Sequence, residues 1–210
     1  MALFETTLLS TAYLPPVEYF FAIAQSRKVL IEQYENYSKQ SYRNRCNIYS
    51  AAGKEALSIP VVKDVGGNRP IRDTRIDYSD PWLQKHERAL LAAYNSSPFY
   101  LYYKDDILRI LDRKETFLFD LNLRLLETLL EMVGLRADIG LTDHYHETDP
   151  LETDLRSRIH PKSKEPDLLA EYKKEKTYYQ VFSEKSGFIP NLSILDLLSA
   201  EGPNALSFLY

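Results

Sequence analysis

The sequence is poor in several residue types and patterns, and each shortage narrows what the protein can be. A single cysteine, Cys46, is present among 210 residues, so no internal disulfide can form, and a reducing compartment suits the chain. Only 7 glycines occur, with no G-x-x-x-x-G-K-S/T phosphate loop, no G-x-G-x-x-G fingerprint and no G-x-S-x-G elbow. A glycine-rich nucleotide cradle is therefore not expected.

Long apolar runs and an excess of basic charge are also missing. No window approaches the roughly 20 apolar residues of a membrane helix, and Glu5 stands where a signal peptide carries basic residues. The formal net charge is −4, whereas a general nucleic-acid binder needs a basic face. We expect a cytoplasmic protein that neither inserts into membranes nor binds nucleic acid.

Tyrosine is the predominant aromatic residue, with 16 copies against 9 phenylalanines and 1 tryptophan. Its flat ring and hydrogen-bonding tip suit polar ligands such as sugars, and they equally suit half-buried strands. The length predicts a single domain over residues 1–210 with a sizeable core.

The first third of the chain predicts a βαβ unit. A strand over 3–10 leads through Pro15 and Pro16 into a helix over 17–25, where apolar residues recur at helical spacing. The apolar run 28–33 suits a second, parallel strand.

A polar loop over 36–45 and a β-hairpin are expected next. Alternating segments over 46–50 and 56–62 flank a connection that contains Gly53. Pro60 cannot donate to a ladder, so the second strand lies at an edge or ends there. Cys46 faces the core in this alternation, and a buried thiol is inert.

The second half is predicted to be mostly helical, with an additional short strand at 74–78. One helix starts at Pro81, is capped by Asp80 and stops at 96–98. Residues 142–176 contain three prolines and few apolar residues, which predicts a lid or long loop excursion. The remaining expected elements are helices over 99–111, 115–133 (stopped by Gly134) and 194–201 (capped by Ser193), and a strand over 177–182. The predicted fold class is α/β, with a mixed β-sheet.

Two early segments carry candidate binding groups. The turn over 13–16 precedes a helix whose first N–H groups can hold an anion, although Glu18 would repel one, and a plain tight turn is equally compatible. In "SYRNRC", Arg43 and Arg45 offer planar forks for carboxylate or phosphate, and Asn44 adds a directional donor and acceptor. The alternative for this segment is a solvated strand entrance.

Histidines supply the remaining candidates. Trp82 and His86 are four residues apart on one helix face, where the histidine can move a proton and the tryptophan can stack a sugar ring. A purely structural histidine is the alternative. His144 and His146 form a His-x-His pattern that suits zinc on a strand, but this segment is expected to be a loop.

A basic run follows in "DLRSRIHPK". Arg156, Arg158, His160 and Lys162 could close over an acidic ligand. Neighbouring acidic residues nearly cancel their charge, which favours a solvated segment held by ion pairs.

Several motifs together resemble the WbqC-like family, in the form common in Bacteroidetes-type bacteria. They are "YLPPVEYF", "ENYSKQSYRNRC", "LSIPV", "W…KH…AYNSSPF" and "YYQVFSEKSGFIPNLSILDLL". More distant members begin with a Gln-Pro-x-x-(aromatic)-Pro pattern, and Tyr13-Leu14-Pro15-Pro16 stands in its place here. Seven residues fall on the family's polar and aromatic positions: Asn44, Arg45, Trp82, His86, Tyr94, Pro98 and Asn122.

The resemblance implies a group-transfer enzyme, possibly for glycine or another aminoacyl group onto a sugar, in cell-surface (O-antigen-like) polysaccharide biosynthesis. Its partner would be a small polar ligand such as a sugar, sugar nucleotide or acyl donor. A non-catalytic binding or assembly protein and a metal-dependent hydrolase using His144 and His146 are the alternatives. The sequence leaves the cofactor and the oligomeric state undetermined. The expected catalytic residues are His86, Asn44 and Arg45, and the expected substrate-binding residues are Tyr13, Trp82, Tyr94, Arg43 and Asn122.

This assignment depends on geometry. It requires the first crossover, the start of the hairpin and the tryptophan-bearing helix to meet around one hollow that admits a polar molecule.

Overall fold

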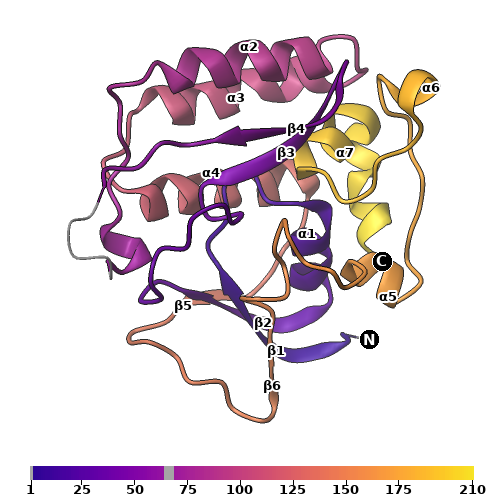
Figure 1. The fold of residues 1–210 in the computed structure, drawn as a ribbon. Coiled ribbons are helices and arrows are strands. Elements are labelled where there is room, and N and C mark those ends of the chain that lie inside the picture. The colour runs from indigo at the N-terminus through magenta and orange to yellow at the C-terminus, as the bar shows by residue number, and fades with distance from the viewer. Residues whose placement is uncertain (1, 64–68) are drawn as a thin grey trace.

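The predicted βαβ unit forms the centre of a parallel sheet (Figure 1). The computed structural model describes residues 2–63 and 69–210. β1 (Phe4–Ser10), α1 (Val17–Ala24) and β2 (Ser26–Glu32) follow one another along the chain. β1 and β2 pair in parallel up to Ser10 and Glu32, which lie opposite each other, so both strands end at the same level.

Two short strands extend this sheet to the order β5-β2-β1-β6. β5 (Ile139–Leu141) pairs with β2, and β6 (Glu152–Asp154) pairs with β1, both in parallel. The carboxyl ends of all four strands therefore share one edge. Most of 142–176 is irregular, as the predicted excursion implies, but the segment also supplies β6 and α5 (Leu168–Glu171).

The predicted hairpin is present as a separate two-stranded sheet. β3 (Arg45–Ser50) pairs with β4 (Gly53–Ser58) antiparallel, and Gly53 provides the positive φ of 101° at the turn. β4 ends just before Pro60, as expected. The mixture of parallel and antiparallel pairing is thus confirmed, with each kind in its own sheet. Cys46 is buried, also as expected.

Helices dominate the second half and confirm that part of the prediction. Gly134 ends α4 with a φ of 74°, and the Ser193 side chain caps α7 by accepting from the N–H of Leu195. The helices are α2 (Trp82–Tyr94), α3 (Tyr100–Asp112), α4 (Leu118–Val133), α6 (Ser183–Ser186) and α7 (Ile194–Glu201), with short 3₁₀ helices η1 (Ile71–Asp73) and η2 (Gly202–Leu209).

Three local predictions are wrong. The segment 74–78 forms only isolated bridges at Arg75 and Ile76. Residues 177–182, all of them described, contain no strand, because side chains instead fix this segment to α7. Asp80 does not cap α2 with its side chain, since its carboxylate binds Lys85 at 2.6 Å.

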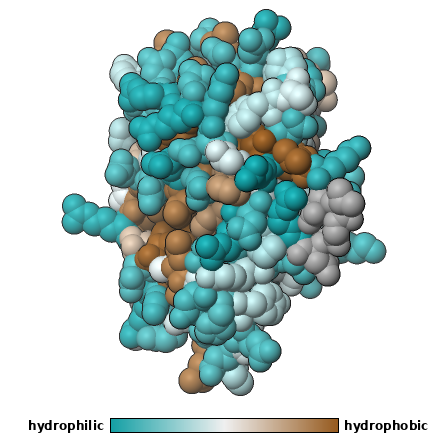
Figure 2. All heavy atoms as spheres, turned by 90° about the vertical axis from the view of Figure 1, so that its left-hand side faces the viewer, coloured by the Kyte–Doolittle hydropathy of each residue, from teal (hydrophilic) through white to brown (hydrophobic). Residues whose placement is uncertain are grey.

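The core lies between the layers. The leucines on one face of α4 (Leu118, Leu121, Leu125 and Leu129) are buried, α3 packs on α4, and α2 packs on β3. In Figure 1, α2 and α3 lie at the top and the parallel sheet lies at the bottom. The face on the left of that view carries hydrophobic side chains in its middle with hydrophilic ones around them (Figure 2). Among the described residues, no helix has the length and apolar composition needed to cross a bilayer.

Candidate functional site

Tyr13, Trp82 and His86 meet in what we call the aromatic cluster. The Tyr13 hydroxyl and His86 Nδ1 form a hydrogen bond of 2.9 Å, and the centroids of the Trp82 and His86 rings lie 5.0 Å apart in an edge-type contact. The structure therefore brings together three residues that the sequence assigns to one site. The cluster is sealed, however, with exposed fractions of 0% for Tyr13, 2% for Trp82 and 3% for His86.

His86 is neutral at physiological pH in this environment. Burial lowers its pKa to about 4, a hydrogen bond with the Ser58 backbone acts in the opposite direction, and the charge of Lys85 lowers the pKa further. A buried, neutral imidazole that links the first crossover to the hairpin has the features of a packing residue. The geometry does not favour it as the group that moves a substrate proton.

Arg43, Asn44 and Arg45 are consecutive, but their side chains reach three different places. Arg43 pairs with Glu35 on the sheet side. The Asn44 amide donates to the carbonyl of Ile59 at 2.8 Å, and Arg45 Nε donates to Ser58 Oγ at 3.1 Å. Only Arg43 contributes to the edge of the parallel sheet.

The remaining predicted ligand-binding residues are fully enclosed. Asn122 is buried on α4 and donates to the carbonyl of Arg43 at 2.8 Å, so it holds the loop that carries this arginine. Tyr94 is buried beside Tyr100, with ring centroids 5.9 Å apart, and burial raises its pKa well above the usual value.

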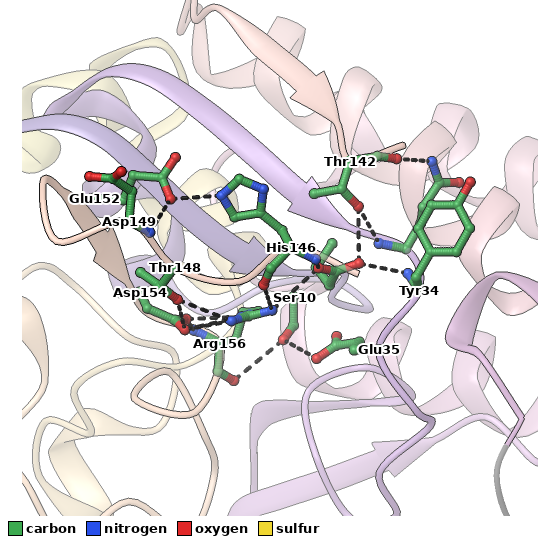
Figure 3. Close-up of polar contacts among 12 residues, drawn as sticks. Ser10, Tyr34, Glu35, Thr142, His146, Thr148, Asp149, Glu152, Asp154 and Arg156 are labelled. Atoms are coloured by element: carbon green, nitrogen blue, oxygen red, sulfur yellow. Dashed lines mark hydrogen bonds and ion pairs between the residues drawn. The ribbon is translucent and has the colours of Figure 1, made fainter. Parts of the chain in front are cut away.

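A polar network occupies the carboxyl edge of the parallel sheet (Figure 3). At its centre is Glu32, the last residue of β2, whose side chain is fully buried. Its Oε1 accepts from the N–H of Tyr34 at 2.7 Å and from Thr142 Oγ at 2.9 Å, and its Oε2 accepts from the N–H of His146 at 2.8 Å. A buried carboxylate requires such partners, because it has lost its hydration.

Arg156 supplies the opposite charge from the segment that follows β6. Its Nη1 lies 3.3 Å from Glu32 Oε2, and its Nη2 donates to Asp154 Oδ2 at 2.7 Å. Burial opposes ionisation of Asp154, but hydrogen bonds from Arg156 and Thr148 outweigh it and lower the pKa of this carboxyl. The pair thus stays ionised at neutral pH.

Ser10 and Arg43 extend the network to β1. Ser10 Oγ accepts from Arg43 Nη2 at 2.7 Å and lies 3.2 Å from Glu35 Oε2 and 3.3 Å from the carbonyl of Arg156. Arg43 grips Glu35 with two nitrogens, one of them Nε at 2.8 Å. Two arginines therefore connect the ends of β1, β2 and β6, as Figure 3 shows for the Arg156 part.

This network lines an open cleft of about 510 Å³, which we call the carboxyl-edge cleft. Open parallel sheets bind ligands at this edge, where loops from several strands converge. Both signs of charge face the cleft, so it suits a ligand with an acidic group and several hydroxyl or amino groups. The lining residues are Glu35, Ser38, Arg43, Tyr145, Asp154, Arg156, Ser157 and His160.

His160 adds a half-buried imidazole to the carboxyl-edge cleft. Burial lowers its pKa, and the nearby charges of Arg43 and Lys162 lower it further, so the ring is neutral at physiological pH. Its Nδ1 accepts from the N–H of Lys162 at 3.1 Å, which places the ring proton on Nε2. His160 can therefore donate a hydrogen bond without carrying charge.

The two histidines considered for zinc have carboxylate partners of their own. His144 Nδ1 lies 2.5 Å from Asp143, His146 Nε2 lies 2.7 Å from Glu152, and the two rings are 6.5 Å apart. Within residues 2–63 and 69–210, no group of three or more histidine, cysteine, aspartate or glutamate side chains could hold a metal ion.

Sequence reasoning missed Ser10, Glu32 and Glu35 and favoured a solvated role for Arg156. The available signal was the polar residue at the end of each predicted parallel strand, since such residues meet at one edge. Arg156 and Glu32 are 124 residues apart, so their pairing also required the position of β6.

Comparison with known proteins supports the family resemblance. Residues 11–169 match the WbqC-like protein family. The chain is 26% identical over 227 residues to the uncharacterized protein Rv1507c of Mycobacterium tuberculosis, with 97% of this chain and 98% of that protein covered. No solved structure matches. The match over most of its length shows that the chain belongs to the WbqC-like protein family.

Proposed function

We propose that the protein is a group-transfer enzyme of cell-surface polysaccharide biosynthesis and that its substrate binds in the carboxyl-edge cleft. The supporting observation is that Arg43, Asp154 and Arg156 line one open, doubly charged cleft at the carboxyl edge of the sheet. Ser10 and Glu32, the last residues of β1 and β2, hold these two arginines from behind. A transferred aminoacyl group such as glycyl fits this pattern, because it carries an amine and is attached through a polar carbonyl.

The cleft offers a role for each group in aminoacyl transfer to a sugar. The sugar hydroxyl or amine attacks the acyl carbonyl, the bond from that carbonyl to the donor breaks, and the nucleophile loses a proton. His160 Nε2 donates to the carbonyl oxygen as negative charge develops on it. We assign proton acceptance to Glu35, whose carboxylate lines the cleft beside Ser10.

Two narrower inferences accompany this proposal. Cys46 is a free, buried thiol, which supports a cytoplasmic location. The closing segment "GFIPNLSILDLL" supports assignment to the Bacteroidetes-type form of the family.

The test is a transfer assay with glycyl adenylate as donor and a nucleotide-linked amino sugar as acceptor, read by mass spectrometry of the sugar. We expect product with the wild-type protein and a loss of about 100-fold in His160→Ala, since an oxyanion donor is removed. Arg109→Lys, on the exposed face of α3, is the matched control and should keep full activity. Equal activity of the His160 variant and the control would contradict the assignment of His160.

A non-catalytic binding protein is the second candidate. The observation that favours it is that Arg43 and Arg156 already form ion pairs with Glu35, Glu32 and Asp154. An acidic ligand could replace these carboxylates on the two arginines and bind without any reaction. Binding of the amino sugar without product would select this candidate. If the wild-type protein gives neither binding nor product, both candidates fail.

A further inference from the structure

A second cleft, of about 590 Å³, lies on the other side of the loop that carries Arg43. Its wall is the segment 59–62, which continues from β4 at the left of Figure 1, the side that Figure 2 turns toward the viewer. This volume is typical of small-molecule sites in proteins. No residue of the aromatic cluster lines it, and neither do Arg43 or Arg156.

The wall of the second cleft is apolar and firmly held. The N–H of Ile59 donates to the carbonyl of Asn44 at 2.8 Å, and the N–H of Val62 donates to the carbonyl of Arg75 at 2.9 Å. Pro60 has no N–H, and its carbonyl accepts from Asp77 at 2.9 Å. Because the backbone is occupied in this way, the wall presents mainly the side chains of Val61 and Val62 to the cleft, with Ile59 buried behind them.

The charge of the second cleft differs from that of the carboxyl-edge cleft. Among the described residues that line it, the charged ones are Lys39, Lys63 and Arg69, and all three are basic. Within the described part of the chain, neither Lys39 nor Lys63 forms an ion pair with a carboxylate. Tyr37 lines the same cleft and adds a flat ring. The combination suits a ligand with two negative charges and a flat, weakly polar part.

One loop borders both clefts. Glu35, Ser38 and Arg43 face the carboxyl-edge cleft, whereas Tyr37, Lys39 and Asn44 line the second cleft. The Asn44 amide bond to the Ile59 carbonyl fixes the loop to the apolar wall, and Asn44 Oδ1 has no hydrogen-bond partner among the described residues. Asn44 is therefore a positioning residue between two sites.

From these observations, we propose that the second cleft binds a nucleoside diphosphate. Lys39 and Lys63 contact the diphosphate, and the base lies between Tyr37 and the wall formed by Val61 and Val62. The binding does not depend on the proposed function. Its link to that function is that a sugar attached to the diphosphate would extend past the shared loop toward Arg43.

The test is isothermal titration calorimetry with UDP, and with uridine and pyrophosphate as separate probes. We expect UDP to bind more tightly than either part alone, and its affinity to fall about tenfold or more in the Lys39→Gln/Lys63→Gln double variant, which removes two charge-assisted contacts. The matched control is Lys54→Gln/Lys164→Gln, which removes two exposed lysines that line neither cleft and should leave the affinity unchanged.

Three results would overturn the proposal: no UDP binding, equal affinity in the two double variants, or pyrophosphate binding as tightly as UDP. Arg156→Lys separates this proposal from the proposed function. We expect this substitution in the carboxyl-edge cleft to leave UDP affinity unchanged even if it abolishes transfer. Loss of UDP binding in this variant would show that UDP binds in the carboxyl-edge cleft and not in the second cleft.

Discussion

The aromatic cluster and the carboxyl-edge network both join distant parts of the chain through polar atoms, yet they differ in what surrounds those atoms. In the aromatic cluster, Tyr13 and His86 form a neutral hydrogen bond within close packing. In the edge network, Glu32 and Arg156 are ionised partners whose neighbours line an open cleft. A neutral contact can be enclosed at little cost, whereas a buried ion pair needs further hydrogen bonds, which the groups around Glu32 and Arg156 supply.

Whether polar side chains are enclosed or border an open cleft distinguishes packing residues from ligand-binding residues better than residue type does. Histidine and tryptophan on one helix face suggest a site, but at Trp82 and His86 no side chain is more than 3% exposed. Serine and glutamate at strand ends are inconspicuous, yet Ser10 and Glu32 belong to the network beside the open cleft. Substitutions in the two regions should therefore have effects of different kinds.

The largest effect is expected from Glu32→Ala. This change leaves the Arg156 guanidinium and the N–H groups of Tyr34 and His146 without their buried partner. Breaking a buried ion pair from one side costs about 3–5 kcal/mol of unfolding free energy. Urea unfolding followed by circular dichroism measures it.

Glu5→Ala provides the matched control for that substitution. Glu5 pairs with Arg27 at 3.4 Å on the surface, where both side chains are more than half exposed. Its removal should change the unfolding free energy by less than about 0.5 kcal/mol. A cost for Glu32→Ala as small as that of the control would show that the edge network does not hold the sheet together.

The next effect is a pH dependence of stability that arises in the aromatic cluster. The pKa of His86 is 6.5 when unperturbed and about 4 in the folded protein, so the unfolded chain takes up a proton first. The stability contributed by the neutral ring is fully present above pH 6.5, falls as the pH drops, and is lower by about 3 kcal/mol near pH 4. His86→Phe should remove this part of the pH profile, while also lowering stability at neutral pH.

The pH dependence of stability that arises from Asp196 has the opposite sign and must be separated from that of His86 in this measurement. Burial raises the pKa of its carboxyl from 3.8 to about 6, so its contribution to stability increases as the pH falls through that range. The pH profiles of the proteins with His86 and with His86→Phe are therefore best compared when both also carry Asp196→Asn. If the two profiles are parallel between pH 6.5 and 4 in that background, His86 does not have the lowered pKa on which its packing role depends.

The smallest effect is expected from Arg45→Ala. Arg45 makes one exposed hydrogen bond, to Ser58, and lines neither cleft. Unfolding free energy should change by less than about 0.5 kcal/mol, and transfer activity should be retained. A loss of transfer activity comparable to that of His160→Ala would restore Arg45 to the site and weaken the contrast between the two regions.

Much of the fold was accessible from the sequence because local patterns determine it. Helical spacing and end signals located α4 and α7, and the strand, diproline and helix order located β1 and α1. β5 and β6 were not accessible, because three residues carry almost no periodicity and pair only through the sheet they join. Residues 177–182 have strand-like composition but find partners on α7 rather than a neighbouring strand.

The candidate site was less accessible than the fold. Proximity of Tyr13, Trp82 and His86 followed from motif positions, but burial depends on packing from segments far along the chain. The edge network needs the register that sets Ser10 opposite Glu32, and it needs β6 beside β1 to deliver Arg156. Neither the strand register nor the position of β6 is encoded in the local spacing of residues.

The brevity of the outer strands has a consequence for how the protein behaves at high concentration. β5 and β6 are each three residues long, so each border of the parallel sheet exposes few free backbone donors and acceptors to an incoming strand. The sheet that carries the proposed site thus resists growing by addition from a neighbouring molecule, even though its two central strands, at seven residues each, would be long enough to template it.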